Sequence, residues 1–231
     1  MKIGKMLGLL VATILASSAF IATEVVADDW SGPYAGLQVG YILGDADTTS
    51  WHTDPLDTHT FSLNGFDVDG FAGGIFGGYM WRVGNDFLIG LEGEWNWASA
   101  DDKITRIDQD IYTWGAEVEQ KWDASLRLNA GKQMGDYMLY ITGGIAWADT
   151  NIKGFTSWDP LQGTDHDATL TGWTIGAGLE RKINENLHAR ILYRYSDYGD
   201  ETWSLAPPND VDMGKIEYTN HMFTVGLSYC F

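Results

Sequence analysis

The sequence predicts an all-β protein, an eight-stranded antiparallel up-and-down β-barrel. Two observations support this fold class. Segments in which apolar and polar residues alternate with a period of two recur along the chain, and this alternation is typical of strands because successive side chains point to opposite faces. The connections between these segments are in turn short and long. The predicted strands cover residues 34–44, 70–82, 86–98, 121–132, 137–149, 168–181, 187–196 and 218–231.

The connections indicate how these strands are joined. Short ones, near residue 84, at 133–136 and at 183–186, contain the Gly, Asn and Asp residues that hairpin turns require. Long ones are rich in Asp, Thr, Ser and Pro. This order, with an even number of strands, is typical of a transmembrane barrel with short periplasmic turns and long extracellular loops. The four predicted loops are residues 45–69, 99–120, 150–167 and 197–217.

The third, fourth and seventh strands each separate an uncharged face from a charged one. In the third strand, Ile89 and Leu91 share one parity, whereas Glu92 and Glu94 share the other. The fourth and seventh strands show the same separation. A Lys or Arg that faces lipid at the midplane costs about 2 to 4 kcal/mol, so the charged faces of a membrane barrel must line its lumen.

Eight of the charged residues are predicted to pair inside the barrel. The interior of an eight-stranded barrel is only wide enough to be filled by side chains, and buried charges are tolerated when they are paired. Four acidic residues oppose four arginines, so we expect a plug of salt bridges rather than an open pore. The predicted lumen network is Arg82, Glu92, Glu94, Asp123, Arg127, Glu180, Arg190 and Arg194.

Aromatic residues lie on the apolar faces near the strand ends. Membrane barrels carry a belt of aromatic side chains at each membrane interface. Two such belts are therefore expected here, one near the short turns and one near the long loops. The predicted belt residues are Trp81, Trp95, Trp97, Trp122, Tyr137, Trp147 and Tyr195.

The last strand ends without a polar tail. Phe223, Val225, Leu227, Tyr229 and Phe231 share one face of this segment. Chain ends are usually polar and dispensable, so this terminal apolar face predicts a structural role, and recognition, for the last residue. We expect the strand to pair with residues 34–44, because open sheet edges are not tolerated in lipid.

The first residues read as a secretory signal. Lys2 and Lys5 precede an apolar run, and Val25 to Ala27 form a small-residue cleavage site. Residues 1–27 are the predicted signal peptide and residues 28–231 the barrel domain, and an uncleaved membrane anchor is the alternative. Removing the signal changes the formal net charge from −18 to −19. Such an acidic chain is not a nucleic-acid partner, because nucleic-acid binders concentrate Lys and Arg on one face.

Both terminal strands carry a family resemblance. "WSGPYAGLQVGY", residues 30–41, resembles the first strand of the small surface-antigen and opacity-type outer-membrane barrels of Gram-negative bacteria, and most of all the immunogenic outer-membrane and porin-family proteins of alphaproteobacteria. "TVGLSYCF", residues 224–231, is similar to the C-terminal signal by which the barrel assembly machinery recognises its substrates. In that pattern the matching residues are Thr224, Gly226, Tyr229 and Phe231.

The resemblance implies an integral, multi-pass protein of the cell outer membrane that acts as a structural envelope component and surface antigen. It implies outer-membrane lipid and lipopolysaccharide as surroundings, and the assembly machinery and periplasmic chaperones as partners during biogenesis. Three alternatives stay open. They are a small porin-like diffusion channel, an adhesin that binds a host ligand or haem through its loops, and a soluble exported barrel of lipocalin type.

Few residues indicate a chemical site. His188 and His221 have no nucleophile and acid fixed beside them by spacing, so we expect no enzyme. Acidic runs at 45–47, 67–69 and 165–167 have no ordered ligand spacing, and neither a metal nor a cofactor is expected. Cys230, the single cysteine, is read as a small lumen filler. The loop tryptophans that could bind a ligand are Trp51, Trp114, Trp158 and Trp203.

Overall fold

A computed structural model of the chain describes residues 30–54, 57–108, 112–156, 165–204 and 213–231. The predicted signal peptide, residues 1–27, lies outside the described residues. No helix within these ranges is long and apolar enough to cross a membrane.

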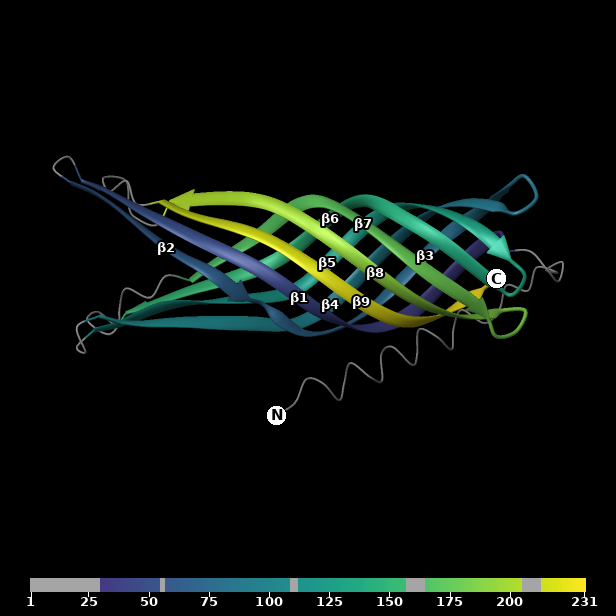
Figure 1. The fold of residues 1–231 in the computed structure, drawn as a ribbon, viewed down its shortest axis with the longest axis horizontal. Coiled ribbons are helices and arrows are strands. Elements are labelled where there is room, and N and C mark those ends of the chain that lie inside the picture. The colour runs from purple at the N-terminus through teal and green to yellow at the C-terminus, as the bar shows by residue number, and fades with distance from the viewer. Residues whose placement is uncertain (1–29, 55–56, 109–111, 157–164, 205–212) are drawn as a thin grey trace.

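The described residues form one antiparallel sheet that closes on itself (Figure 1). β2 and β3 are separated only by Val68, whose backbone N–H donates to the Gly44 carbonyl at 2.7 Å, so together they form one continuous strand of the barrel. With β2 and β3 counted as one, the barrel has eight strands, and the predicted fold class is confirmed. The strands are β1 (Gly32–Asp54), β2 (Asp57–Asp67), β3 (Asp69–Val83), β4 (Phe87–Asp108), β5 (Tyr112–Met134), β6 (Tyr137–Thr156), β7 (Asp165–Lys182), β8 (Leu187–Ser204) and β9 (Met213–Cys230).

Pairing between the first and last strands closes the barrel. β1 and β9 are in register from Tyr34 opposite Cys230 to Trp51 opposite Met213. On its other side β1 pairs with β2 and β3, and each later strand pairs with the next. Each of the eight strands therefore has a hydrogen-bonded neighbour on both sides, as a strand in lipid requires.

The three predicted short turns are confirmed at one end of the barrel, which we call the turn end. Gly84 and Gly135 have φ of 78° and 63°, in the left-handed region that favours glycine. In the third turn the Asn184 side chain accepts hydrogen bonds from the N–H groups of Asn186 (3.0 Å) and Leu187 (2.8 Å). Each turn reverses the chain with local chemistry that its sequence supplies.

The predicted long loops are wrong in extent, because most of their described residues belong to strands. We call this part the extension: the described residues of 45–69, 99–120, 150–167 and 197–217. Alternation continues there with its polarity inverted. Asp45 and Asp47 are exposed, for example, whereas Ala46 and Thr48 are buried in the interior. Such an inversion is expected where a membrane barrel leaves the lipid, because its outer face then meets water and the charged face turns outward.

Irregularities in the ladder lie at the start of the extension. Register shifts occur between Ala46 and Thr48, between Trp97 and Ala100, between Gln120 and Trp122 and between Asp197 and Asp200. A β-bulge adds one residue to a strand and re-aims its side chains. On β5 the odd-numbered residues point into the barrel from Asp123 onward, whereas the even-numbered ones do so up to Gln120. The bulge between them therefore turns the charged face of this strand from the lumen to the outside.

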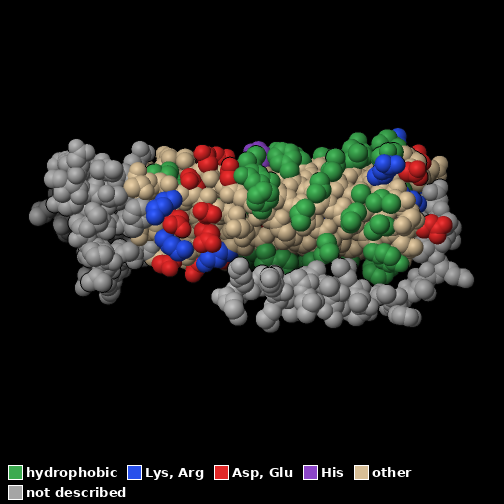
Figure 2. Space-filling model, turned by 90° about the horizontal axis from the view of Figure 1, so that it is seen from below, with side chains coloured by type: hydrophobic (Ala, Val, Ile, Leu, Met, Phe, Trp, Pro, Cys, Tyr) green, Lys and Arg blue, Asp and Glu red, His purple; other side chains and the backbone are tan. Residues whose placement is uncertain are grey.

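The outer surface changes along the barrel axis. Figure 2 shows hydrophobic side chains over the middle and the turn end, and Lys, Asp and Glu gathered on the extension. Many large apolar side chains on the middle and the turn end of the barrel are exposed, among them Val39 (62 %), Phe71 (75 %) and Leu128 (68 %). Exposed apolar patches of this size mark a surface that meets an apolar environment.

Glycine lets neighbouring strands approach around the lumen. A Cβ on Gly144 would lie 2.0 Å from the Leu126 carbonyl oxygen and 2.8 Å from the Arg127 Cα. We expect Gly144→Ala to lower the free energy of unfolding by about 1 to 3 kcal/mol, because the strands must separate to admit the methyl group. Urea unfolding of the refolded barrel measures this. Gly93→Ala, with open space around its Cβ, is the matched control, and equal midpoints for the two variants would contradict the prediction.

Candidate functional site: the barrel lumen and its outer belts

The middle of the lumen contains a layer of six buried charges, which we call the ionic layer. Arg127 on β5 lies at its centre and contacts the carboxylates of Glu92 and Glu94 on β4, the latter at 2.6 Å from Nη2. Its Nη1 donates to Ser125 Oγ at 2.6 Å. The side chains of the three charged residues are at most 1 % exposed.

Two arginines of β8 complete the layer. Arg190 Nη1 lies 2.8 Å from Glu92 Oε2, and its guanidinium stacks on the Phe76 ring with 3.3 Å between Cζ and the ring centroid. Arg194 binds Glu94 Oε1 at 3.1 Å and also Asp123. Three arginines therefore face three carboxylates, and each charge has at least one partner of opposite sign.

Neutral side chains supply further hydrogen bonds to the charged groups, although the Nε atoms of Arg127, Arg190 and Arg194 have no partner among the described residues. Asn96 Nδ2 donates to Glu94 Oε1 at 2.7 Å and to Asp123 Oδ1 at 3.0 Å. Tyr34 donates its hydroxyl proton to Glu92 Oε2 at 2.7 Å, and Gln38 Oε1 accepts from Arg190 at 2.6 Å. Sequence reasoning missed Tyr34, Gln38, Asn96 and Ser125. Each of these residues has a neutral polar group at a position whose side chain points into the lumen, and a search limited to charged residues does not find them.

Two predicted members of the network lie outside the ionic layer, and this part of the prediction is corrected. Arg82 lies at the rim of the turn end, where it donates to the Asn85 carbonyl (2.8 Å) and to Gln133 Oε1 (2.9 Å). Glu180 is buried in the lumen, but its Oε2 lies 3.9 Å from His188 Nδ1. Glu180 and Arg190 are register partners, yet the Arg190 side chain reaches Glu92 and Glu94 instead.

Apolar clusters lie on both sides of the ionic layer inside the barrel. Toward the turn end, Phe76 and Met80 belong to a cluster with Trp30, Tyr34, Leu88, Met138, Tyr140 and Leu192. In and near the extension a second cluster contains Ile42, Phe66, Leu170 and Ile216 with the stacked rings of Tyr198 and Tyr218. Side chains therefore fill the described lumen in three layers.

The predicted belt residues lie on the outer face. Trp95 and Trp122 stack with their ring centroids 4.4 Å apart, and Trp97 is 46 % exposed. Trp147 and Tyr195 are half-buried on the same side of the barrel wall. Toward the turn end, Trp81 and Tyr137 are 46 % and 40 % exposed.

The final strand presents the four predicted signal residues on two faces. Thr224 is buried in the lumen, and a Cβ on Gly226 would lie 2.9 Å from the Leu37 carbonyl oxygen. Tyr229 and Phe231 contact each other edge to face outside, with 5.2 Å between ring centroids. The Phe231 N–H donates to the Pro33 carbonyl at 3.0 Å, so the last residue still pairs with the start of β1.

Ion pairs on the extension and at its border are exposed. Lys121 Nζ lies 2.6 Å from Asp167 Oδ1, and this hydrogen bond lowers the pKa of Asp167 and raises the pKa of Lys121. Lys153 pairs with Glu119 at 3.5 Å. Such exposed pairs contribute little to stability. Within the described residues no group of three or more His, Cys, Asp and Glu side chains could hold a metal ion.

The side chains of the four candidate loop tryptophans, Trp51, Trp114, Trp158 and Trp203, lie outside the described residues. A loop ligand therefore stays a prediction. His221, which was considered as a catalytic residue, lies near the aromatic belt, where its Nδ1 shares a hydrogen bond with the Tyr193 hydroxyl at 2.8 Å.

Comparisons with known proteins place this architecture in a family. The family model described as outer membrane protein beta-barrel domain matches residues 12–231. The chain belongs to this family. The 31 kDa outer-membrane immunogenic protein of Brucella melitensis biotype 1 is 30% identical over 240 residues, which cover 96% of this chain and 97% of that protein.

Other relatives agree with this assignment. The 22 kDa outer membrane protein of Rhizobium leguminosarum bv. viciae is 30% identical, with 74% of this chain and 69% of that protein covered. The solved structure of the outer membrane protein OprG from Pseudomonas aeruginosa has a TM-score of 0.58 at 16% identity, with 90% of this chain and 99% of that chain covered. This last likeness concerns the fold alone.

Family and fold together establish an outer-membrane protein. The predicted resemblance and location are confirmed, and the soluble lipocalin-type barrel is excluded. In barrels of this class the short turns face the periplasm. The turn end is therefore the periplasmic end, and the extension lies outside the cell.

Proposed function

We propose that this protein is a structural component and surface antigen of the outer membrane whose lumen is closed by paired charges. The ionic layer is the observation that supports this function best. Its three arginines and three carboxylates join β4, β5 and β8 across the lumen, and apolar clusters lie above and below it. Charges that are paired with one another across the lumen favour a closed barrel over an open path for solutes.

The antigenic part of the proposal concerns the extension. Its outer face carries exposed charged residues such as Asp45, Asp101 and Lys103, which would be presented to the outside of the cell. Relatives from Brucella are named outer-membrane immunogenic proteins. An exposed and charged surface is suited to recognition by antibodies.

The arrangement near Cys230 favours a role without catalysis. Cys230 Sγ lies 3.4 Å from His188 Nδ1, and Glu180 Oε2 lies 3.9 Å from the same nitrogen. A nucleophile, base and acid act together when the nucleophile and the acid use opposite ring nitrogens of the histidine. Cys230 Sγ also lies 3.8 Å from His188 Nε2, but the thiol is closer to Nδ1, the nitrogen that Glu180 approaches, so the two groups do not take opposite ring nitrogens as in a catalytic triad.

The outer surface supports the partners that we propose. The apolar band and its two belts fit outer-membrane lipid, including the acyl chains of lipopolysaccharide. The barrel assembly machinery and periplasmic chaperones are proposed partners during biogenesis, through Tyr229, Phe231 and the rest of the final strand.

Antibody binding tests the proposed orientation and exposure. Antibodies raised against residues 99–108 of the extension are expected to label intact cells, because this segment lies outside the membrane. Antibodies against the turn at residues 183–186 should bind only after the outer membrane is permeabilised. Labelling of intact cells through the turn, or recovery of the protein outside the outer-membrane fraction, would refute the proposal.

Planar-bilayer recording tests whether the lumen is closed. The refolded protein is expected to give no steady conductance, because the ionic layer and both apolar clusters fill the lumen. The same recording is made with Arg127→Met and with Glu92→Gln. A steady conductance of the wild-type protein that changes in either variant would show instead that the ionic layer lines an ion path, as in a small diffusion channel.

A further inference from the structure

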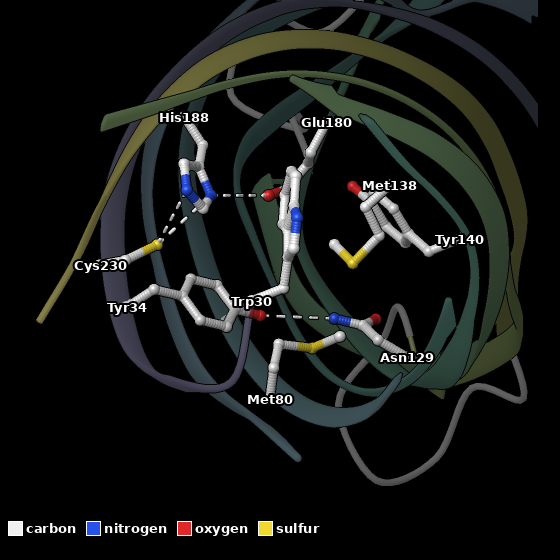
Figure 3. Close-up of a pocket in the computed structure, with 9 residues that line it drawn as sticks. All are labelled: Trp30, Tyr34, Met80, Asn129, Met138, Tyr140, Glu180, His188 and Cys230. Carbon is white, nitrogen blue, oxygen red and sulfur yellow. Dashed lines mark hydrogen bonds and ion pairs between the residues drawn. The ribbon is translucent and has the colours of Figure 1, made fainter. Parts of the chain in front are cut away.

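A small chamber lined by both polar and apolar side chains, Met80 and Met138 among the latter, lies in the lumen toward the turn end (Figure 3). Trp30 lines the chamber, and its ring centroid lies 4.4 Å from that of His188. Tyr140, Asn129 and Glu180 line it. The volume open to the centre of a water molecule is about 10 Å³.

Three buried polar atoms of this chamber have no hydrogen-bond partner among the described residues. They are Trp30 Nε1, the Tyr140 hydroxyl and Asn129 Oδ1, on side chains that are at most 5 % exposed. Figure 3 shows the Tyr140 hydroxyl, the Glu180 carboxylate and the indole of Trp30 directed into the same space. A buried polar group without a partner costs about 1 to 3 kcal/mol, so three in one chamber indicate a shared ligand.

We propose that the chamber binds one ordered water molecule. A buried water needs roughly 10 to 15 Å³ and two to four polar partners, and the chamber supplies both. Trp30 Nε1 can donate to the water, Glu180 and Asn129 can accept from it, and the Tyr140 hydroxyl can do either. The chamber is too small for a larger organic ligand.

This water extends the hydrogen-bonded plug toward the periplasm. Asn129 Nδ2 donates to the Tyr34 hydroxyl at 3.4 Å, and Tyr34 donates to Glu92 in the ionic layer at 2.7 Å. Through Asn129 the water joins Trp30, the first residue described before β1, to the charges in the middle of the lumen. It thereby fixes Trp30 inside the barrel.

Tyr140→Phe tests the proposal because the two possible states of the chamber predict opposite signs. With a water present, the variant removes one of its partners, and the urea midpoint of the refolded barrel falls. In a dry chamber, the variant removes an unsatisfied hydroxyl, and the midpoint rises. Tyr79→Phe is the matched control, since Tyr79 faces outward and is 41 % exposed.

Trp30→Phe and the double variant supply a second measurement. Trp30→Phe keeps the ring but removes the donor, so the two substitutions are expected to be non-additive if one water joins them. A magnetisation-transfer NMR experiment on the Trp30 indole N–H should show contact with a bound water in the wild-type protein. A raised midpoint for Tyr140→Phe, additive effects of the two substitutions, or an indole without water contact would each overturn the proposal.

Discussion

Arg127→Met is expected to lower the free energy of unfolding by about 3 to 5 kcal/mol, because it leaves three buried carboxylates with only two arginine partners. Arg127 is the residue that binds both Glu92 and Glu94 through one nitrogen. Without it, Arg190 and Arg194 must balance three carboxylates in a lumen that water does not screen. Urea unfolding of the refolded barrel in detergent or liposomes measures the loss.

Two control variants separate charge balance from packing. Arg127→Met combined with Glu92→Gln leaves two arginines and two carboxylates, so we expect it to recover much of the stability that Arg127→Met loses. Arg82→Met changes an arginine at the rim, where it donates hydrogen bonds to Asn85 and Gln133, and its expected loss is about 1 kcal/mol. A double variant as unstable as Arg127→Met would show that unpaired charge is not the cause.

Whether a charged side chain faces the lumen or the outside could be predicted from its odd or even position along the strand. Arg127, Arg190 and Arg194 all point into the lumen, as the cost of placing them in lipid requires. The belt tryptophans follow from the same rule, since Trp95 and Trp97 have the parity opposite to Glu92 and Glu94. Parity works here because lipid and lumen place opposite demands on neighbouring residues.

The height of a charge along the barrel axis could not be predicted in this way. Arg82 and Glu180 have the lumen parity, but they lie nearer the turn end than the ionic layer does. Long side chains also reach away from their own register position, as Arg190 does when it binds Glu92 rather than its register partner Glu180. Pairing in the lumen therefore depends on strand tilt and side-chain reach, which the sequence pattern does not report.

The extension was missed because its outer face is rich in Asp and Thr, as loops are. The signal was present in the interior residues, where Ala46, Ala100 and Ile216 alternate with exposed polar residues. Outside the membrane the barrel has the polarity of a water-soluble protein, apolar inside and charged outside. The single barrel therefore has two parts of opposite polarity along its axis, and the belt that contains Trp97 and Trp122 lies where the two parts meet.

Deleting Phe231 is expected to reduce the level of protein in the outer membrane several-fold, while the barrel that does assemble stays folded. In the finished barrel Phe231 contributes one backbone hydrogen bond, to Pro33, and an edge contact with Tyr229. These two interactions amount to about 1 to 3 kcal/mol. A typical domain has about 5 to 15 kcal/mol of stability, so this loss leaves nearly all assembled molecules folded.

A several-fold fall must therefore arise before the barrel is complete, when the terminal residues Tyr229 and Phe231 would be recognised. Quantitative blotting of outer-membrane fractions and heat-modifiable migration in gels measure the two effects separately. Tyr137→Ala is the matched control, because it removes an aromatic side chain of the belt at the turn end without changing the final strand. Normal levels after deletion of Phe231 would refute the signal, and an equal fall for Tyr137→Ala would show that the belt, rather than recognition of the chain end, limits assembly.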